Sequence, residues 1–325
     1  MGNTVVVGSC NGLIHGIDKA TGSARWKYEA RADGGRPEFH STPLVTSGLL
    51  LLGSDDRRPD GVGFVYAIEA ASGAVRWKTR IGRGLMTDIV ALDDRLFLVT
   101  LDGELVALDL ATGQKAWSFQ GGRPLGSKDM NFLTTPAVTR ERVYFGGSDG
   151  VLYALSPEAG ALVWKSVIGS RVTTAVFPGS DALFLGTFDG RLLRADASRG
   201  EVTAELKLGQ VPFGPIVPSG KLLLVLSAER DAPVLNAVEA SLAAVRWSQR
   251  AAGGWSSARP YVWRGKALAG DEAGHLSAFA PDDGSPVWTR QVDGVIRGVG
   301  FEDDRLFVGT LRGAVFAVRI PSDSD

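Results

Sequence analysis

Short apolar stretches separated by polar turns run along the whole chain, and residues 142–166 hold most of one unit of this pattern. Residues 142–147 and 151–155 are rich in β-branched and aromatic side chains. Asp149-Gly150 joins them, a dipeptide typical of tight hairpins because such turns require positive φ. A turn over 156–160 leads to a further strand over 162–165, and a looser strand precedes the unit. The pattern therefore predicts four antiparallel strands, which we call A to D in chain order.

The unit recurs from end to end, and a tryptophan marks most of its copies. A turn that ends in glycine follows strand C, and tryptophan stands four residues after that glycine, as in Asp109-Leu-Ala-Thr-Gly113 before Trp117. Neighbouring copies lie roughly forty to fifty residues apart, which is the signature of a repeat architecture. The marked positions are Trp26, Trp77, Trp117, Trp164, Trp247 and Trp288.

Counting the B–C hairpins gives eight copies, with B strands near residues 4, 49, 95, 142, 182, 221, 265 and 305. Eight four-stranded antiparallel sheets arranged radially make an eight-bladed β-propeller, so the sequence predicts an all-β fold with residues 1–325 as a single domain. By this count the first repeat lacks strand A and the last lacks strand D. Either two blades are three-stranded, or the tail pairs loosely, or the chain is part of a longer one.

In every copy but the fifth, a small residue stands two positions before the start of the turn, for example Ala107 before Asp109. Such a residue lets a large indole pack closely, so the six tryptophans are predicted to be structural docking residues. The fifth copy supports this interpretation, because it has Ala204 where tryptophan belongs and Arg194 where the small residue belongs. Losing both together is the expected behaviour of a packing pair.

The formal net charge is −1, from 35 basic and 36 acidic residues, so nothing favours nucleic acid as a partner. No segment approaches the roughly 20 apolar residues that span a bilayer, so no transmembrane segment is predicted. The single cysteine, Cys10, excludes an intramolecular disulfide and leaves cytosol and periplasm open. Residues 7–10 resemble a lipoprotein processing site only faintly, and Cys10 is expected to end a strand.

The turn motif resembles that of the pyrroloquinoline-quinone-like (PQQ-like) repeat superfamily, and the resemblance covers essentially the whole chain. It implies an eight-bladed propeller whose blades are docked by tryptophans. The superfamily includes quinone-dependent alcohol and sugar dehydrogenases, propeller domains of multidomain enzymes, and the BamB-type lipoprotein of the bacterial outer-membrane assembly machinery. The motif specifies the fold far better than the function.

The B–C and D–A connections leave each antiparallel sheet at the same end, which we call the loop face. The long insertions, at residues 29–40, 55–63, 121–132 and 251–257, nearly all lie there. Binding residues concentrate on loops held by a rigid scaffold, so this face is the predicted functional surface. Its candidate binding residues are basic or aromatic: Arg83, Arg171, Arg259, Arg297, Lys128, His40 and Trp255.

A group of basic residues on the loop face suits an anionic ligand or an acidic segment of a partner. The alternative is a set of scattered, solvated arginines that are partly paired with nearby carboxylates such as Glu38 and Asp55. Catalytic patterns are poor. The three histidines, His15, His40 and His275, belong to different repeats, so no shared histidine metal site is predicted.

Quinone dehydrogenases of this superfamily typically use Ca²⁺, a catalytic aspartate and, in many members, adjacent cysteines. One cysteine excludes that pair. Where the innermost strands begin on the loop face, Asp88, Asp129 and Asn131 are too few oxygen donors for a calcium site. The sequence therefore predicts no catalytic residue, no cofactor and no metal. The PQQ-dependent dehydrogenase is the least favoured function.

The favoured function is a non-catalytic protein-interaction scaffold similar to BamB-type propellers, which binds a protein partner through the loop face or an exposed blade edge. A second interpretation is a ligand-sensing domain of a multidomain protein, in which Trp255 and the arginines face an anionic metabolite or a glycan. The compartment stays open. The chain as written carries no signal peptide and would be cytoplasmic, whereas a trimmed mature domain would be periplasmic or extracellular.

Overall fold

The computed structural model describes residues 3–124, 134–229, 232–251, 254 and 259–320. Within these residues the chain is all-β: 30 strands form eight antiparallel sheets, and a single 3₁₀ turn, η1 (Ala30–Asp33), follows the third strand. We number the sheets 1 to 8 in chain order. The chain divides into two compact units, residues 1–172 with sheets 1 to 4 and residues 173–325 with sheets 5 to 8.

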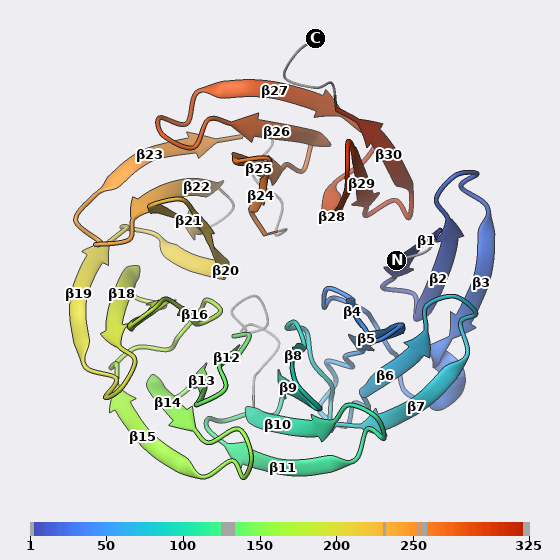
Figure 1. The fold of residues 1–325 in the computed structure, drawn as a ribbon, viewed down its shortest axis with the longest axis horizontal. Helices are drawn as coiled ribbons and strands as arrows, with labels where there is room; N and C mark the ends of the chain where they lie inside the picture. The colour runs from blue at the N-terminus through green and yellow to red at the C-terminus, as the bar shows by residue number, and fades with distance from the viewer. Residues whose placement is uncertain (1–2, 125–133, 230–231, 252–253, 255–258, 321–325) are drawn as a thin grey trace. The chain divides into compact units, whose positions relative to one another are not determined.

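Each sheet of the first unit uses strands that are consecutive in the sequence, so every pairing is a hairpin or a short connection (Figure 1). Sheet 1 contains β1 (Thr4–Gly8), β2 (Leu13–Asp18) and β3 (Ala24–Glu29). Sheet 2 contains β4 (Leu44–Thr46), β5 (Leu49–Gly53), β6 (Phe64–Glu69) and β7 (Val75–Arg80). Sheet 3 contains β8 (Val90–Leu92), β9 (Arg95–Val99), β10 (Glu104–Asp109) and β11 (Lys115–Gln120). Sheet 4 contains β12 (Ala137–Val138), β13 (Val143–Gly146), β14 (Val151–Leu155) and β15 (Leu162–Val167).

The second unit repeats this order. Sheet 5 contains β16 (Phe177–Pro178), β17 (Ala182–Gly186), β18 (Arg191–Asp196) and β19 (Val202–Lys207). Sheet 6 contains β20 (Val211–Ser219), β21 (Leu222–Glu229), β22 (Ala232–Glu239) and β23 (Val245–Arg250). Sheet 7 contains β24 (Tyr261–Trp263), β25 (Lys266–Gly270), β26 (His275–Phe279) and β27 (Pro286–Gln291). Sheet 8 contains β28 (Ile296–Glu302), β29 (Arg305–Thr310) and β30 (Val315–Arg319).

Over the described residues, six sheets have four strands and two have three. Sheet 1 lacks strand A and sheet 8 lacks strand D, as the repeat count predicts. The predicted all-β fold is therefore confirmed, with three-stranded sheets at the first and last repeats.

In sheets 2 to 4, strands B and C are nearly continuous apolar runs because both of their faces are buried. In sheet 2, β5 and β6 are almost wholly buried, whereas β7 alternates between half-buried and exposed side chains, as a strand with one solvated face does. The apolar layer between sheets 2 and 3 shows the result: Leu51 and Val65 of sheet 2 join Leu98 and Val106 of sheet 3 in one cluster. Such layers between successive sheets form the core of each unit.

Four of the six docking tryptophans make two kinds of contact, which sheets 2 and 3 illustrate, whereas Nε1 of Trp164 is buried without a hydrogen-bond partner. Ala67 lies directly opposite Trp77 across strands β6 and β7, so a small side chain gives the indole room. The ring then reaches the C–D turn of sheet 3, where its Nε1 donates to Leu110 O at 3.0 Å and its face packs on Gly113. The same hydrogen bond joins Trp26 to Ala70, Trp117 to Pro157 and Trp247 to Pro281.

The fifth repeat replaces this arrangement with another. Arg194 pairs across the strands with Ala204, which takes the place of the tryptophan. In the facing turn of sheet 6, alanine stands at position 243 in place of the usual glycine, and Leu242 adopts a positive φ of 60°. Leu242 is buried and belongs to an apolar cluster against which Ala204 packs. A leucine from the next turn thus fills space that an indole fills elsewhere.

No helix in the described part of the chain is long and apolar enough to cross a membrane.

Candidate functional site

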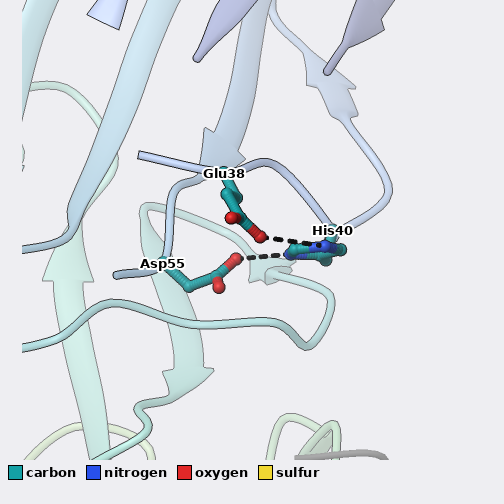
Figure 2. A group of neighbouring side chains, drawn as sticks. All are labelled: Glu38, His40 and Asp55. Atoms are coloured by element: carbon teal, nitrogen blue, oxygen red, sulfur yellow. Dashed lines mark hydrogen bonds and ion pairs between the residues drawn. The ribbon is translucent and has the colours of Figure 1, made fainter. Parts of the chain in front are cut away.

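The first insertion of the loop face joins strand D of sheet 1 to strand A of sheet 2, and the second joins strands B and C of sheet 2. Their backbones pair where they meet: Glu38 N donates to Asp55 O at 3.0 Å, and Asp55 N donates to Glu38 O at 2.9 Å. This short antiparallel bridge fixes both carboxylates beside His40. Figure 2 shows the side chains of Glu38 and Asp55 directed toward the imidazole of His40.

The imidazole of His40 makes three contacts. Its Nδ1 lies 2.7 Å from Asp55 Oδ1, and its Nε2 lies 3.6 Å from Glu38 Oε2. On the turn between β1 and β2, the exposed Cys10 places Sγ 3.7 Å from the same Nε2. Arg57 donates to Glu38 Oε2 and lies 3.8 Å from Asp55 Oδ2.

Asp55 is the unusual member of this group because its side chain is fully buried. Burial raises the pKa of its carboxyl, while the hydrogen bond to His40 opposes that shift. One oxygen accepts from His40, and the other, Oδ2, is buried without a hydrogen-bond partner. A buried carboxylate with an unsatisfied oxygen is costly, which makes this group a candidate for a role beyond packing.

Arg83 follows β7, and its side chain is buried and hydrogen-bonded. Its Nε donates to Asp102 Oδ1 at 2.8 Å, its NH2 group donates to Leu101 O at 2.7 Å, and the residue is only 9% exposed. The hairpin of sheet 3 therefore holds the guanidinium. Arg83 also adjoins the His40 group through the backbone, because Asp56 N donates to Arg83 O at 2.8 Å. The structure thus brings two of the predicted site residues onto neighbouring segments.

The other predicted residues lie elsewhere. Arg171 is half-buried in the first unit, on the connection after β15. In the second unit, Arg297 is exposed at a register shift between β28 and β29, while burial lowers the pKa of Arg259, opposed by Tyr261. All three make contacts with neighbouring residues. Lys128 and Trp255, and also Asp129 and Asn131, lie outside the described residues.

The loop face of the second unit carries exposed apolar side chains at the tips of B–C turns. Leu311 of sheet 8 is 55% exposed and Phe188 of sheet 5 is 49% exposed, whereas Leu101, at the equivalent turn position of sheet 3, is fully buried. Leu311 borders an open hollow of about 430 Å³ that also includes Glu272 and the ion pair between Arg312 and Asp293. These residues belong to B–C turns or a D–A connection.

Sequence reasoning identified His40 but not its grouping with Cys10, Glu38 and Asp55. The sequence does hold a weak signal, since Glu38 and His40 flank the buried Phe39 and so point to the same side of an extended segment. The pairing of Glu38 with Asp55 and the approach of Cys10 depend on how two insertions and a turn meet, and no local pattern encodes that meeting.

Comparisons with known proteins identify relatives of the whole chain. The sequence model of the family described as outer membrane protein assembly factor BamB matches residues 58–207 and 189–322. The BamB of Yersinia pestis is 24% identical over 97% of this chain and 82% of its own length. The BamB of Moranella endobia is 22% identical over the same shares of the two chains.

Solved structures show the fold. The crystal structure of BamB from Moraxella catarrhalis superposes with a TM-score of 0.77 at 16% identity, covering 98% of this chain and 95% of that one. The quinohemoprotein alcohol dehydrogenase from Comamonas testosteroni gives a TM-score of 0.70 at 13% identity, covering 94% of this chain and 68% of that one. An enzyme and an assembly factor share this architecture, so the likeness confirms the predicted β-propeller fold and decides nothing about activity.

Proposed function

Since this chain belongs to the family of the outer membrane protein assembly factor BamB, we propose that it is a non-catalytic scaffold that binds a protein component of bacterial outer-membrane assembly. The match over residues 58–322 is the observation that carries this proposal, together with relatives of the same description that align with 97% of the chain. Outer-membrane assembly implies a periplasmic location. The scaffold needs no cofactor and carries out no reaction.

The loop face of the second unit is the proposed binding surface. Leu311 and Phe188 expose apolar area at turn tips, and the exposed Arg297 lies on a strand that begins at the same end of sheet 8. Aromatic residues and arginine are enriched in protein–protein interfaces, and exposed apolar area on the same face adds to the surface that a partner can bury. A metabolite sensor would need convergent arginines in a polar pocket, whereas the one arginine that lines the hollow is paired with Asp293.

The open edge of β30 is a second proposed binding surface. β30 pairs with β29 on one side, and no other described strand pairs with it. A partner segment could add there as a fourth strand, because an unpaired edge offers a row of backbone donors and acceptors.

Site-specific cross-linking in a bacterium that carries this protein tests the proposal. A photoreactive residue at position 311 or 188 should capture a component of the outer-membrane assembly machinery, identified by mass spectrometry. The same residue at position 283, in the exposed C–D turn of sheet 7 at the opposite end of its sheet, is the matched control. Capture from position 283 alone would reject the loop face. If the protein is in the periplasm but captures no assembly component from the loop face or from β30, the scaffold proposal is wrong.

A further inference from the structure

The cluster around His40 has the composition of a metal site. Glu38, His40 and Asp55 place potential ligand atoms within 4.8 Å of one another, and Cys10 adds a sulfur 3.7 Å from the imidazole. A thiolate, an imidazole and a carboxylate are the donors that tetrahedral zinc sites use, whereas calcium and magnesium prefer oxygen alone. All four residues lie in the first unit.

Asp55 determines which nitrogen of the His40 imidazole is available to a metal ion. Its carboxylate is fully buried and lies 2.7 Å from Nδ1, so it accepts a hydrogen bond from Nδ1–H and leaves the lone pair on Nε2. Ligating histidines usually donate their second ring nitrogen to a carboxylate or carbonyl in this way, because the hydrogen bond orients the ring and raises its basicity. The 2.7 Å separation is that of a hydrogen bond, so Asp55 is an orienting partner and Nε2 is the metal-binding atom.

The other two donors lie on the Nε2 side at distances that suit zinc. Zinc bonds of about 2.0–2.3 Å in tetrahedral geometry separate neighbouring ligand atoms by about 3.3–3.6 Å. Glu38 Oε2 is 3.6 Å and Cys10 Sγ is 3.7 Å from Nε2, so both distances to the imidazole are close to those of a zinc site. Cys10 does not belong to the group whose ligand atoms all lie within 4.8 Å of one another, so its side chain must turn toward Glu38 when the ion binds. The exposure of Cys10 and the 27% exposure of the His40 side chain give an ion access from solvent.

Charge also favours a cation here. Glu38 and Asp55 bring two carboxylates together, and Arg57 is the one guanidinium that contacts both of them in the described structure. Asp55 Oδ2 is buried without a hydrogen-bond partner and lies 3.8 Å from Arg57 Nε. A nearby divalent ion would offset this excess of negative charge, which the protein alone leaves incompletely compensated.

We propose that Cys10, Glu38 and His40 bind a zinc ion through Sγ, a carboxylate oxygen and Nε2, with water as fourth ligand and Asp55 as the orienting partner of His40. The ion joins the first hairpin of the chain directly to the first insertion of the loop face, and is linked to the second insertion through the hydrogen bond between His40 and Asp55. It stabilises their meeting in the manner of a structural cross-link, because metal-binding energy that requires the folded arrangement adds to folding.

His275 provides a matched internal control. Its Nδ1 lies 2.8 Å from Asp271 Oδ2, so it repeats the orienting pair of the first unit. No cysteine or second carboxylate joins it in a group of potential ligands among the described residues. An imidazole that bound zinc merely because an aspartate orients it would do so at both places.

Titration of the purified, chelator-treated protein with Zn²⁺ in a calorimeter tests the proposal. One equivalent should bind, and His40→Gln should weaken binding at least 100-fold while His275→Gln leaves it unchanged. Asp55→Asn should weaken it by about 10–100-fold, the usual effect of losing an orienting partner. Arg57→Gln should tighten it several-fold, because a competing cation is removed.

Co²⁺ in place of Zn²⁺ reports the sulfur ligand directly. The Co²⁺ protein should show thiolate-to-metal charge-transfer absorption, and Cys10→Ser should abolish that band. Cys10 lies on an exposed turn, so this variant tests the site even if Asp55→Asn fails to fold. A wild-type protein that binds no zinc, or equal loss of binding in His275→Gln and His40→Gln, would overturn the proposal. Zinc binding without the cobalt–thiolate band would remove Cys10 from the site.

Discussion

Gly113 packs directly against the indole of Trp77 from the preceding sheet: a Cβ atom at position 113 would lie 2.4 Å from Cε3 of that ring. Gly113 also has a φ of 71°, in the left-handed region. We therefore expect Gly113→Ala to destabilise the protein by about 2–4 kcal/mol, from left-handed strain and from overpacking against the indole. Urea unfolding followed by tryptophan fluorescence measures this loss.

Gly48 is the matched control for the contact. It has a φ of 77° and no atom within 4 Å of its would-be Cβ, so Gly48→Ala carries only the left-handed cost of about 1–2 kcal/mol. The difference between the two variants isolates the packing of the glycine against the indole. Equal losses would show that the indole moves aside at little cost and that docking does not depend on Gly113.

The fifth repeat should not accept the missing tryptophan. Arg194 faces position 204 across the strands, and the buried Leu242 belongs to the cluster against which Ala204 packs. Ala204→Trp should therefore destabilise the protein by about 1–3 kcal/mol through overpacking. The double variant Ala204→Trp with Arg194→Ala should recover part of that loss, because it restores the small partner found opposite the other tryptophans.

A double-mutant cycle measured by denaturant unfolding gives the coupling between positions 204 and 194. Arg194→Ala alone loses an ion pair to Asp181 and a hydrogen bond to Thr203 Oγ1, both at the surface, so we expect it to cost about 1 kcal/mol. If the two substitutions add without coupling, the pairing of a small residue with tryptophan is not the reason for their joint absence.

The repeat could be predicted from the sequence because its determinants are local. Ala107, Asp109, Gly113 and Trp117 lie within one short segment, and each has a steric or hydrogen-bonding reason to stand where it does. The missing strands of the first and last sheets followed from counting the same segments. The role of Leu242 could not be predicted from the sequence, because it depends on how this residue packs against the neighbouring sheet.

The site was less accessible to sequence reasoning. Arg83 and Arg297 look alike in the sequence as basic residues near strand ends, yet one is 9% exposed and the other is exposed on a strand bulge. Burial of a guanidinium depends on whether a carboxylate from the next hairpin, here Asp102, reaches it. Likewise, His40 acquires its partners only where two insertions pair through Glu38 and Asp55.

Acid should weaken the C–D turns. The side chain of Asp109 accepts from the backbone N of Thr112 at 2.8 Å and from its Oγ1 at 2.7 Å, and these hydrogen bonds hold the pKa of Asp109 below its usual range. Because the folded pKa lies below the unfolded value of about 3.9, the stabilisation is complete above about pH 4 and is lost as pH falls through the folded pKa.

We therefore expect Asp109→Asn to have a lower free energy of unfolding than the wild type at pH 7. This difference, which we call the stability gap, should narrow below about pH 4. Urea unfolding at a series of pH values from neutral to strongly acidic measures the gap. Ser156 occupies the equivalent position in sheet 4, where its Oγ accepts from Ala161 N at 3.3 Å, so Ser156→Ala should give a gap that does not change with pH. A pH-independent gap for Asp109→Asn would show that its carboxylate is not the stabilising group.

We expect Arg83 to contribute mainly to the stability of the fold and not to the binding of a partner. Replacing it by methionine keeps the apolar stem but removes the hydrogen bonds to Asp102 and Leu101, so Arg83→Met should cost about 1.5–3 kcal/mol, the usual range for hydrogen bonds to a charged group. Arg297→Met, on an exposed position, should stay within about 0.5 kcal/mol of the wild type. Urea unfolding of both variants, alongside capture of the partner from position 311, separates the two roles. If Arg83→Met keeps full stability and yet loses the partner, the guanidinium contributes to binding directly; if Arg297→Met loses stability instead, its contacts within the unit are structural.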